Sequence, residues 1–357
     1  MNEDIIDKWD SVIDNFNADD KLASALKFYV RNIISQNSVI IIDTKHLSLL
    51  TGINYDVLNK MINAPENFYR IFSIPKRNGG TRQIAAPYPS LLFIQKWIYK
   101  NILLPTTNLQ ESAKGFIPGL SIVDNASPHL NHKQILKMDI KDFFPSIKIN
   151  RIVKIFKKLG YYNRIAYTLA SLCCKDRCLP QGAPTSPILS NIVMRHIDAR
   201  IAGLAKHFNI TYTRYADDLT FSGECIPVNF IKYITSIIEE GGFIINSNKT
   251  RLIGKNARKI ITGVSITSGK VTIPKYLKRR LRQEAYYIHK YGYKQHVKHC
   301  NLTNDPAYKL RILGKFSYWK SVERQNEYLN TLNEQLKKDL KHTSWWNSLV
   351  LFASLNY

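Results

Sequence analysis

The sequence has little cysteine and no long apolar run, and each shortage excludes a class of protein. Its five cysteines form no Cys-x-x-Cys pair, and a zinc site around Cys174-x-x-x-Cys178 would have an incomplete ligand set. No apolar stretch is long enough to cross a membrane. The first twenty residues carry seven acidic side chains against one lysine and contain no secretory core. We therefore expect a cytoplasmic protein with reduced thiols and no membrane partner.

Acidic residues are also scarce over the chain as a whole. The 357 residues include 51 Lys and Arg against 27 Asp and Glu, which gives a net charge of +24. A chain of this length is expected to form two or three domains, and it shows no internal repeat or low-complexity linker. The positive excess predicts a polyanionic partner, most simply a phosphate backbone bound in a salt-dependent way.

The chain centres on the short segment Tyr215-Ala216-Asp217-Asp218. Residues 210–214 and 219–222 on either side alternate between apolar and polar, which predicts a β-hairpin with two carboxylates at its tip. Adjacent like charges are costly to ionise unless a cation lies between them, and a divalent ion is the usual solution. Taken alone, these four residues would also fit a solvated turn.

A third carboxylate precedes the hairpin by 78 positions (217 minus 139). The apolar segment 135–138 ends at Asp139, and a tight aromatic turn follows at Asp142-Phe143-Phe144. Three carboxylates at strand ends meet the needs of a two-metal site. Two Mg²⁺ ions about 4 Å apart activate an attacking hydroxyl and stabilise a leaving pyrophosphate.

Between these strands lies a turn rich in proline and glycine, residues 179–187, which contains Gln181 and Gly182. The helical run 188–204 follows it. Such a turn lets backbone approach a flat ligand closely, here an incoming nucleotide and its templating base.

The three motifs resemble, in this order, the palm of a reverse transcriptase: Asp139-x-x-Asp142-Phe-Phe, Gln181-Gly182-x-x-x-Ser-Pro, and Tyr-Ala-Asp-Asp. The resemblance implies an α+β, right-hand polymerase fold with fingers, a palm of antiparallel sheet plus helices, and a helical thumb. We expect an N-terminal helical region at 1–64, a fingers-and-palm domain at 65–270, and an RNA-binding thumb at 271–357.

The resemblance also implies roles for individual residues. Asp139, Asp217 and Asp218 are expected to bind two Mg²⁺ and catalyse phosphoryl transfer, with Asp139 and Asp217 bridging both ions. Phe144 is expected to exclude the 2′-hydroxyl of a nucleotide and so to select dNTPs. The nucleotide-binding candidates are Lys76, Arg82, Asp142, Phe143, Phe144, Gln181, Gly182 and Lys249.

Two of these groups have open alternatives. Residues 72–84 predict a hairpin around an Asn-Gly-Gly turn, and Lys76 and Arg82 on its facing strands would clamp a triphosphate unless the hairpin is merely a basic surface. Lys249 would serve as a general acid for the leaving group, as an electrostatic partner, or only as a solvated lysine.

Two further signatures resemble the retron reverse transcriptases in particular: Asn125-Ala126-x-x-His129, and Thr262-Gly263 with Ile261 in a position that is Val in the family pattern. On its own, His129 would equally be a hydrogen-bonded loop anchor. The retron resemblance implies a cognate structured non-coding RNA as primer and template, a branched RNA-DNA product (msDNA), and a separately encoded effector protein in antiphage defence.

The positive charge concentrates near the C-terminal end. Between Lys270 and Lys298 there are nine Lys and Arg against the single Glu284, with tyrosines interleaved. This pattern suits a helical thumb that grips a nucleic-acid backbone, although charge runs are often only solvated helix faces. The RNA-binding candidates are Lys275, Lys278, Arg279, Arg280, Arg282, Tyr286, Tyr287 and Lys290.

Two rival interpretations remain at this point. One is another bacterial reverse transcriptase, of the group II intron type or another defence type. Of these, the intron type would be expected to carry an appended maturase domain. The other is a catalytically silent RNA-binding scaffold, which would be free to lose a carboxylate. Metal-dependent incorporation of dNTPs separates an enzyme from a scaffold.

Overall fold

The computed structural model describes residues 2–16, 19–76, 79–106, 108–302 and 305–341, and the chain divides into two compact units. Unit 1 comprises Met1–Leu120 and Leu136–Leu252, and unit 2 comprises Ser121–Ile135 and Ile253–Tyr357. Unit 2 is therefore discontinuous in sequence. The domain limits predicted at 64 and 270 stay predictions.

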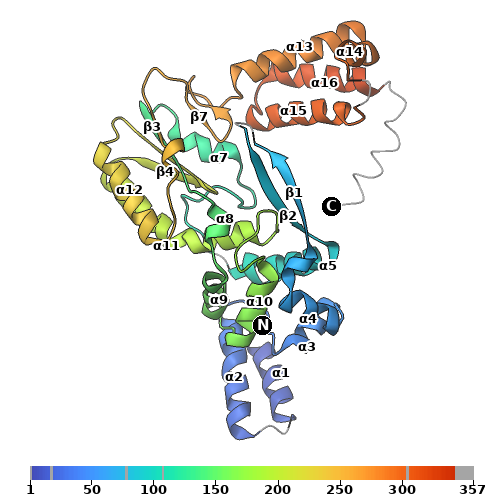
Figure 1. Cartoon of the computed structure of the whole chain (residues 1–357), viewed down its shortest axis with the longest axis vertical. Helices are drawn as coiled ribbons and strands as arrows, with labels where there is room; N and C mark the ends of the chain where they lie inside the picture. Colours follow the sequence, from blue (N-terminus) through green and yellow to red (C-terminus); the bar gives the residue numbers. More distant parts are fainter. Residues whose placement is uncertain (1, 17–18, 77–78, 107, 303–304, 342–357) are drawn as a thin grey trace. The chain divides into compact units, whose positions relative to one another are not determined.

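Unit 1 begins with four helices (Figure 1): α1 Asn2–Asp14, α2 Asp20–Ser35, α3 Thr44–Thr51 and α4 Tyr55–Asn63. Three of them start at a side-chain cap. Asp19 accepts hydrogen bonds from the first turn of α2, and Asp43 and Asn54 do the same for α3 and α4. These caps satisfy backbone N–H groups that have no partner inside the helix, so they fix where each helix begins.

An antiparallel hairpin follows the short helix η1 Pro65–Phe68: strand β1 Tyr69–Pro75 pairs with β2 Thr81–Pro87. Gly79 and Gly80 in its turn have φ of 85° and 77°, which glycine adopts without strain. Residues 77–78, including the predicted turn residue Asn78, lie outside the described residues. The chain continues as α5 Pro89–Ile98, a π-helical turn η2 Tyr99–Leu103 and α6 Leu104–Thr106.

The centre of unit 1 is a four-stranded sheet in the order β4-β5-β3-β6. Its strands are β3 Gln134–Asp139, β4 Thr211–Tyr215, β5 Asp218–Gly223 and β6 Arg251–Ile253. The first two residues of β3 and the last residue of β6 fall in unit 2. Helices α8 Phe143–Ser146, α9 Ile149–Lys158, α10 Asn163–Cys173, α11 Ser186–His207, α12 Val228–Glu240 and η4 Ser247–Lys249 belong to unit 1. Helix α11 packs on β4 and on α12. The mixed α+β architecture predicted from the sequence is confirmed.

Unit 2 combines an early segment of the chain with the C-terminal helices. Its elements are α7 Ile122–Ala126, η3 Ser127–His129, β7 Ile260–Ile261, β8 Val264–Ser265, α13 Lys275–Tyr291, α14 Tyr293–His299, α15 Tyr308–Val322 and α16 Glu327–Lys341. Helix α13 packs on α14 and α16, and α15 packs on α16. Leu281, Phe316 and Trp319 are fully buried in the resulting core. The C-terminal part is thus helical, as predicted.

No helix among the described residues has the length and apolar character needed to span a bilayer.

Candidate active site

The Tyr-Ala-Asp-Asp segment forms the predicted hairpin. Strands β4 and β5 pair antiparallel with Tyr215 opposite Asp218, so Ala216 and Asp217 form a two-residue turn. Ala216 has a φ of 59°, in the left-handed region that such tight turns require. Asp217 therefore lies at the tip and Asp218 begins β5.

The end of β3 lies beside this tip. The N–H of Ile140 donates to the carbonyl of Asp217 at 3.0 Å, and the N–H of Asn246 donates to the carbonyl of Asp139 at 2.7 Å. These backbone bonds bring together two carboxylates that are 78 positions apart in the sequence. The structure thus gathers Asp139, Asp217 and Asp218 at neighbouring strand ends within unit 1.

Burial and neighbouring carboxylates raise the pKa values of Asp217 and Asp218. Burial raises the pKa of Asp217 to about 6, and the charges of Asp218 and Asp139 add to the rise. Burial also raises the pKa of Asp218, against the opposing effect of nearby cations, of which Lys137 is the strongest and Arg82 is another. Carboxylates in such a group remain ionised more readily when a cation neutralises them.

Lys249, in η4, supplies one such cation. Its Nζ donates to the two carboxylate oxygens of Asp139 at 2.8 and 2.9 Å. Desolvation works against the charge of Lys249, but the hydrogen bond to Asp139 and the three carboxylates outweigh it and raise its pKa. Lys249 is therefore the counter-charge of Asp139 and not a merely solvated lysine.

The donor set fits a divalent cation, because clustered carboxylate oxygens are the hard ligands that Mg²⁺ prefers. Within the described part of the chain, no three His, Cys, Asp or Glu side chains are already grouped closely enough to hold one metal ion. The Asp139 carboxylate faces Lys249 instead. A cation bound at this site would therefore share the Asp139 carboxylate with the Lys249 ammonium or displace it.

A buried ion pair supports the hairpin from beneath, and the sequence motifs did not reveal it. Arg214 and Asp198 are both fully buried, and Arg214 donates from Nε and Nη2 to the two carboxylate oxygens of Asp198 at 2.8 and 2.6 Å. Arg214 also donates from Nη1 to the carbonyl of Ala216 at 3.0 Å and from Nη2 to Oδ1 of Asn191 at 3.1 Å. The guanidinium thus ties the turn that carries Asp217 to helix α11.

Two glycines are placed where the backbone leaves no room for a side chain. A Cβ on Gly115 would lie 2.8 Å from the nitrogen of Ala216. Gly182 has a φ of 131°, and a Cβ there would lie 2.7 Å from the carbonyl oxygen of Ala85 in β2. Ala85 also donates its N–H to the carbonyl of Gln181 at 2.8 Å. The Gln181-Gly182 turn is therefore fastened, backbone to backbone, to the β1–β2 hairpin.

The two phenylalanines of the Asp142-Phe-Phe turn have different environments. Phe143 is buried, and its ring centre lies 5.8 Å from that of Phe243. Its side chain is therefore not available to a nucleotide, and only its backbone could take part in the predicted nucleotide binding. Phe144 is half-buried, and its ring lies 6.3 Å from that of Phe116. The Phe116 ring lies 5.9 Å from that of Tyr215, so these aromatics adjoin the hairpin.

The β1–β2 hairpin places its two predicted cations differently. Arg82 lies in β2 opposite Ile74, and its charge opposes the raised pKa of Asp218, so it is within electrostatic reach of the carboxylates. Lys76 lies just beyond β1, where its N–H donates to the carbonyl of Gly80 at 3.0 Å. The expectation that both occupy facing strand positions is therefore wrong, because β1 ends at Pro75.

The two signatures that resemble retron enzymes, Asn125-Ala126-x-x-His129 and Thr262-Gly263, lie in unit 2. The Asn125 side chain donates to Oγ1 of Thr262 at 3.4 Å, and Ala126 is fully buried in the core of the unit. Thr262 and Gly263 have φ of 44° and 87° and form the two-residue turn between β7 and β8. His129 is fully buried, and burial followed by the charge of His132 lowers its pKa to about 3. These residues join segments that are more than a hundred positions apart in sequence.

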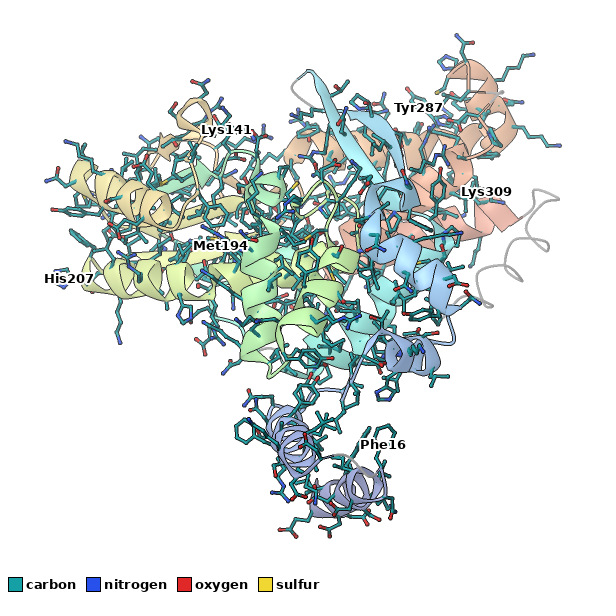
Figure 2. All side chains as sticks on the ribbon, turned by 60° about the horizontal axis from the view of Figure 1, so that its bottom comes forward. Phe16, Lys141, Met194, His207, Tyr287 and Lys309 are labelled. Carbon is teal, nitrogen blue, oxygen red and sulfur yellow. The ribbon has the colours of Figure 1, made fainter. Side chains whose placement is uncertain are left out.

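The cationic face of α13 is partly used inside unit 2. Lys278 pairs with Glu323 at 2.8 Å, Arg280 pairs with Glu284 at 2.9 Å, and the Arg282 guanidinium lies 5.0 Å from the ring centre of Tyr328. Exposed aromatics remain on the same helix, among them Tyr287 (Figure 2) and Tyr286. Lys275, Arg279 and Lys290 are also exposed. This face can offer both stacking and charge to a ligand.

Comparisons with known proteins agree on one family. The family model described as "Reverse transcriptase (RNA-dependent DNA polymerase)" matches residues 74–277. Retron Ec86 reverse transcriptase of Escherichia coli is 36% identical over 246 residues, which cover 68% of this chain and 77% of that protein. Retron Ec83 reverse transcriptase, also from Escherichia coli, is 33% identical over 281 residues and is covered to 86%.

Coverage of other proteins is lower. Retron Mx65 reverse transcriptase of Myxococcus xanthus is 37% identical over 222 residues, and the chain spans about half, 51%, of its length. Among solved structures, the foamy viral protease-reverse transcriptase in complex with double-stranded DNA aligns with 76% of this chain and 43% of that chain, at 15% identity and a TM-score of 0.40.

Proposed function

The chain belongs to the retron reverse transcriptases, and from this membership we propose that it uses a cognate structured non-coding RNA as primer and template and dNTPs as substrates. Membership confirms the right-hand polymerase fold and the RNA-directed DNA polymerase activity predicted from the three motifs. The proposed product is a branched RNA-DNA hybrid, msDNA. The group II intron alternative is disfavoured, because the relatives named above are retron enzymes.

One observation carries the catalytic part of the proposal: the backbone bond from Ile140 to Asp217 that places β3 beside the hairpin tip. It supports Asp139, Asp217 and Asp218 as the catalytic and metal-binding residues. Two Mg²⁺ held there would supply the charge that activates an attacking hydroxyl and stabilises the pyrophosphate. The chain's own part is to hold its carboxylates ready and to position the nucleotide.

The surrounding residues have roles in that positioning. Lys249 already carries a proton beside the carboxylates, so it is placed to neutralise or protonate the leaving group once it has released Asp139. Arg82 brings a forked cation to the same site for the triphosphate, with Lys76 beyond the end of β1. Asp142 begins the aromatic turn with a φ of 46°, in the left-handed region. The backbone of Asp142 and Phe143 in this turn is proposed to contact the triphosphate.

Selection of the sugar and of the base pair is assigned to two other elements. The half-buried Phe144 ring is the group proposed to exclude a 2′-hydroxyl. Gln181 and Gly182 are proposed to bracket the base pair, which their attachment to β2 supports. Asn125, Ala126, His129, Thr262 and Gly263 are proposed to act as structural residues of unit 2 and not at the site of chemistry.

RNA binding is assigned to α13. Its exposed Lys275, Arg279 and Lys290 would contact phosphates, while Tyr286 and Tyr287 would stack on unpaired bases. Lys278, Arg280 and Arg282 are held by intramolecular partners and would contribute less. A separately encoded effector protein, a part in antiphage defence and a cytoplasmic location complete the proposal, and the retron resemblance alone supports these three.

The test is to express the protein with its native flanking DNA, extract the bound nucleic acid and treat it with RNase, DNase and a debranching enzyme. An Asp217→Ala variant serves as the control. A short DNA joined to RNA through a debranchable bond, seen only with the intact enzyme, supports the retron function. Unbranched DNA would preserve the polymerase but reject the branched product, and bound RNA without attached DNA in both samples would favour a scaffold.

A further inference from the structure

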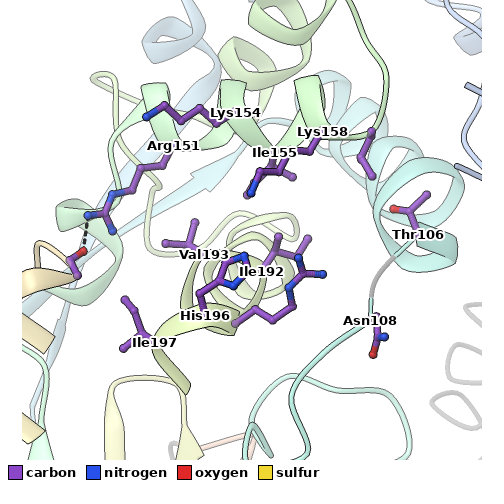
Figure 3. Close-up of a pocket in the computed structure, with 13 residues that line it drawn as sticks. Thr106, Asn108, Arg151, Lys154, Ile155, Lys158, Ile192, Val193, His196 and Ile197 are labelled. Atoms are coloured by element: carbon purple, nitrogen blue, oxygen red, sulfur yellow. Dashed lines mark hydrogen bonds between the residues drawn. The ribbon is translucent and has the colours of Figure 1, made fainter. Parts of the chain in front are cut away.

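Helices α9 and α11 enclose a pocket of about 310 Å³ that none of the three carboxylates lines (Figure 3). None of the nucleotide-binding candidates lines it either. Part of its lining is aliphatic. Ile155 of α9 and Leu159, which directly follows α9, contribute from one side, and Ile192, Val193 and Ile197 contribute from α11. The pocket lies entirely within unit 1, and the polymerase function described above does not use it.

Four cations line this pocket: Arg151, Lys154 and Lys158 from α9, and Arg195 from α11. His196 of α11 also lines it. No Asp or Glu is among its lining residues. In Figure 3 the α9 and α11 side chains lie on facing sides of the hollow. The pocket therefore combines a partly aliphatic lining with charges of one sign.

One of these cations has a structural role, whereas three do not. Arg151 donates to the carbonyl of Gly241, and its guanidinium lies 4.9 Å from the ring centre of Phe243. Within the part of the chain that the structure describes, no hydrogen bond or ion pair joins the side chain of Lys154, Lys158 or Arg195 to another residue. Lys154 and Lys158 stand one helical turn apart, a spacing at which like charges repel each other and destabilise a helix.

An anionic ligand in the pocket would offset the repulsion between Lys154 and Lys158. Three cations around a hollow with no carboxylate create a positive potential that a neighbouring anion lowers. The pocket has room for about one amino-acid residue or one nucleotide. Its three cations without side-chain partners can nevertheless pair with more than one anionic group of a longer ligand. A nucleic-acid strand carries a phosphate at every nucleotide, whereas a peptide needs a run of acidic residues to match it.

The lining also indicates how a strand would be held. Asn108 adds an amide that can donate to a phosphate or to a 2′-hydroxyl, whereas the Thr106 hydroxyl already donates to the carbonyl of Ile102 and can only accept from a 2′-hydroxyl. Among the described residues, no Phe, Tyr or Trp lines the pocket, so this part of the chain supplies no platform for base stacking there. Contacts of this kind read the backbone and not the base sequence.

We propose that the pocket between α9 and α11 is a second binding site, for the sugar-phosphate backbone of a single-stranded segment of the RNA, with Lys154, Lys158 and Arg195 as phosphate contacts. That the strand is the RNA the enzyme copies rests on the proposed function. The site holds RNA without regard to sequence, and neither the catalytic carboxylates nor the nucleotide-binding candidates line it.

The experiment compares two double variants of the full-length protein that each lose two positive charges. Lys154→Gln/Lys158→Gln removes cations from the pocket, and Lys157→Gln/Lys206→Gln removes exposed cations of the same two helices that do not line it. The probe is a fluorescent single-stranded oligouridine of several tens of nucleotides. Its affinity is measured by anisotropy over a range of salt concentrations.

Log affinity falls with log salt, and in the pocket variant this negative slope should become shallower by about 1.4, since each phosphate contact to a single strand contributes roughly 0.7. The control variant should leave the slope near that of the unmodified protein. Equal slopes in all three proteins, or the same change in both variants, would overturn the proposal. If polyglutamate binding falls in the pocket variant while the RNA slope is unchanged, the site takes an acidic peptide and the RNA assignment is also overturned.

Primer extension on a short RNA-templated duplex keeps this result separate from the enzymatic assignment. Both double variants should extend the short primer as well as the unmodified protein does, and Asp217→Ala should not extend it. Loss of extension in the pocket variant alone would place Lys154 and Lys158 at the polymerase site and reject a separate one. Absence of extension even in the unmodified protein would count against the proposed function, while the salt slopes would still decide whether the pocket binds RNA.

Discussion

Replacing Asp198 by alanine should strongly destabilise unit 1. The side chains of Arg214 and Asp198 are fully buried, and two hydrogen bonds of 2.8 and 2.6 Å join them. Without the carboxylate, a charged guanidinium stays buried without a counter-charge, and the Tyr212 hydroxyl loses its acceptor at 2.8 Å. Breaking a buried pair in this way costs about 3–5 kcal/mol. That is a large part of the roughly 5–15 kcal/mol by which proteins are stable.

Urea unfolding of Asp198→Ala, Arg214→Met and the double variant measures this cost. The double variant should be more stable than Asp198→Ala, because it leaves no buried charge unpaired. It should nevertheless polymerise slowly, since Arg214 also holds the carbonyl of Ala216 at 3.0 Å. We expect kcat to fall with little change in the KM for dNTPs, because Arg214 acts through the turn and does not touch the nucleotide.

Arg200→Ala is the matched control on the same helix. Arg200 pairs with Glu240 at 2.7 Å, but both side chains are about half exposed, so its loss should cost no more than about 1 kcal/mol. If Asp198→Ala costs no more than Arg200→Ala, or if the double variant retains full kcat, the reasoning about the buried pair is refuted.

Four further predictions concern other parts of the chain. Asp139→Ala should abolish DNA synthesis in a primer-extension assay while RNA binding, measured by anisotropy, remains; retained synthesis would reject the metal-site assignment. Phe144→Ala should admit rNTPs, and an enzyme that still refuses them would show that another group excludes the 2′-hydroxyl. Gly182→Ala should lower thermal stability by roughly 1–3 kcal/mol, since its Cβ would lie 2.7 Å from the Ala85 carbonyl, whereas Gly203→Ala, with open space around it, should not. Because burial lowers the pKa of His129 from 6.5 to about 3, the unfolded chain binds a proton below pH 6.5 that the folded chain does not, so stability should fall by about 2 kcal/mol between pH 6.5 and 5, and less so in His129→Gln.

Local patterns predicted the elements that carry the chemistry. The period of two around Ala216-Asp217 and the apolar segment before Asp139 each depend on neighbours in sequence, and both hairpin and strand end are found where the pattern places them. The Arg214–Asp198 pair could not be found in this way. Its members are 16 positions apart on a strand and a helix, and only the packing of α11 on β4 brings them together.

The direction in which a side chain points could not be predicted from the sequence either. The motif does not say that Phe143 turns into the core while Phe144 stays half-buried, because that depends on Phe243 from a distant segment. Likewise, Lys249 was identified from its motif, but its ion pair with Asp139 requires that η4 return to the end of β3. The turn at Thr262-Gly263 and its bond to Asn125 also needed the fold, since 137 positions separate Asn125 and Thr262.

The discontinuity of unit 2 has a consequence for synthesis on the ribosome. Ala126 and Ile135 are made early, yet they are buried against residues that follow position 253. The two parts are separated by 118 positions (253 minus 135), so at about 5–20 residues per second the early segment waits roughly 6–24 s for its partners. During that interval its apolar side chains are open to chaperones or to wrong contacts. The nascent chain can therefore assemble most of its catalytic strands before the C-terminal part of unit 2 has been made.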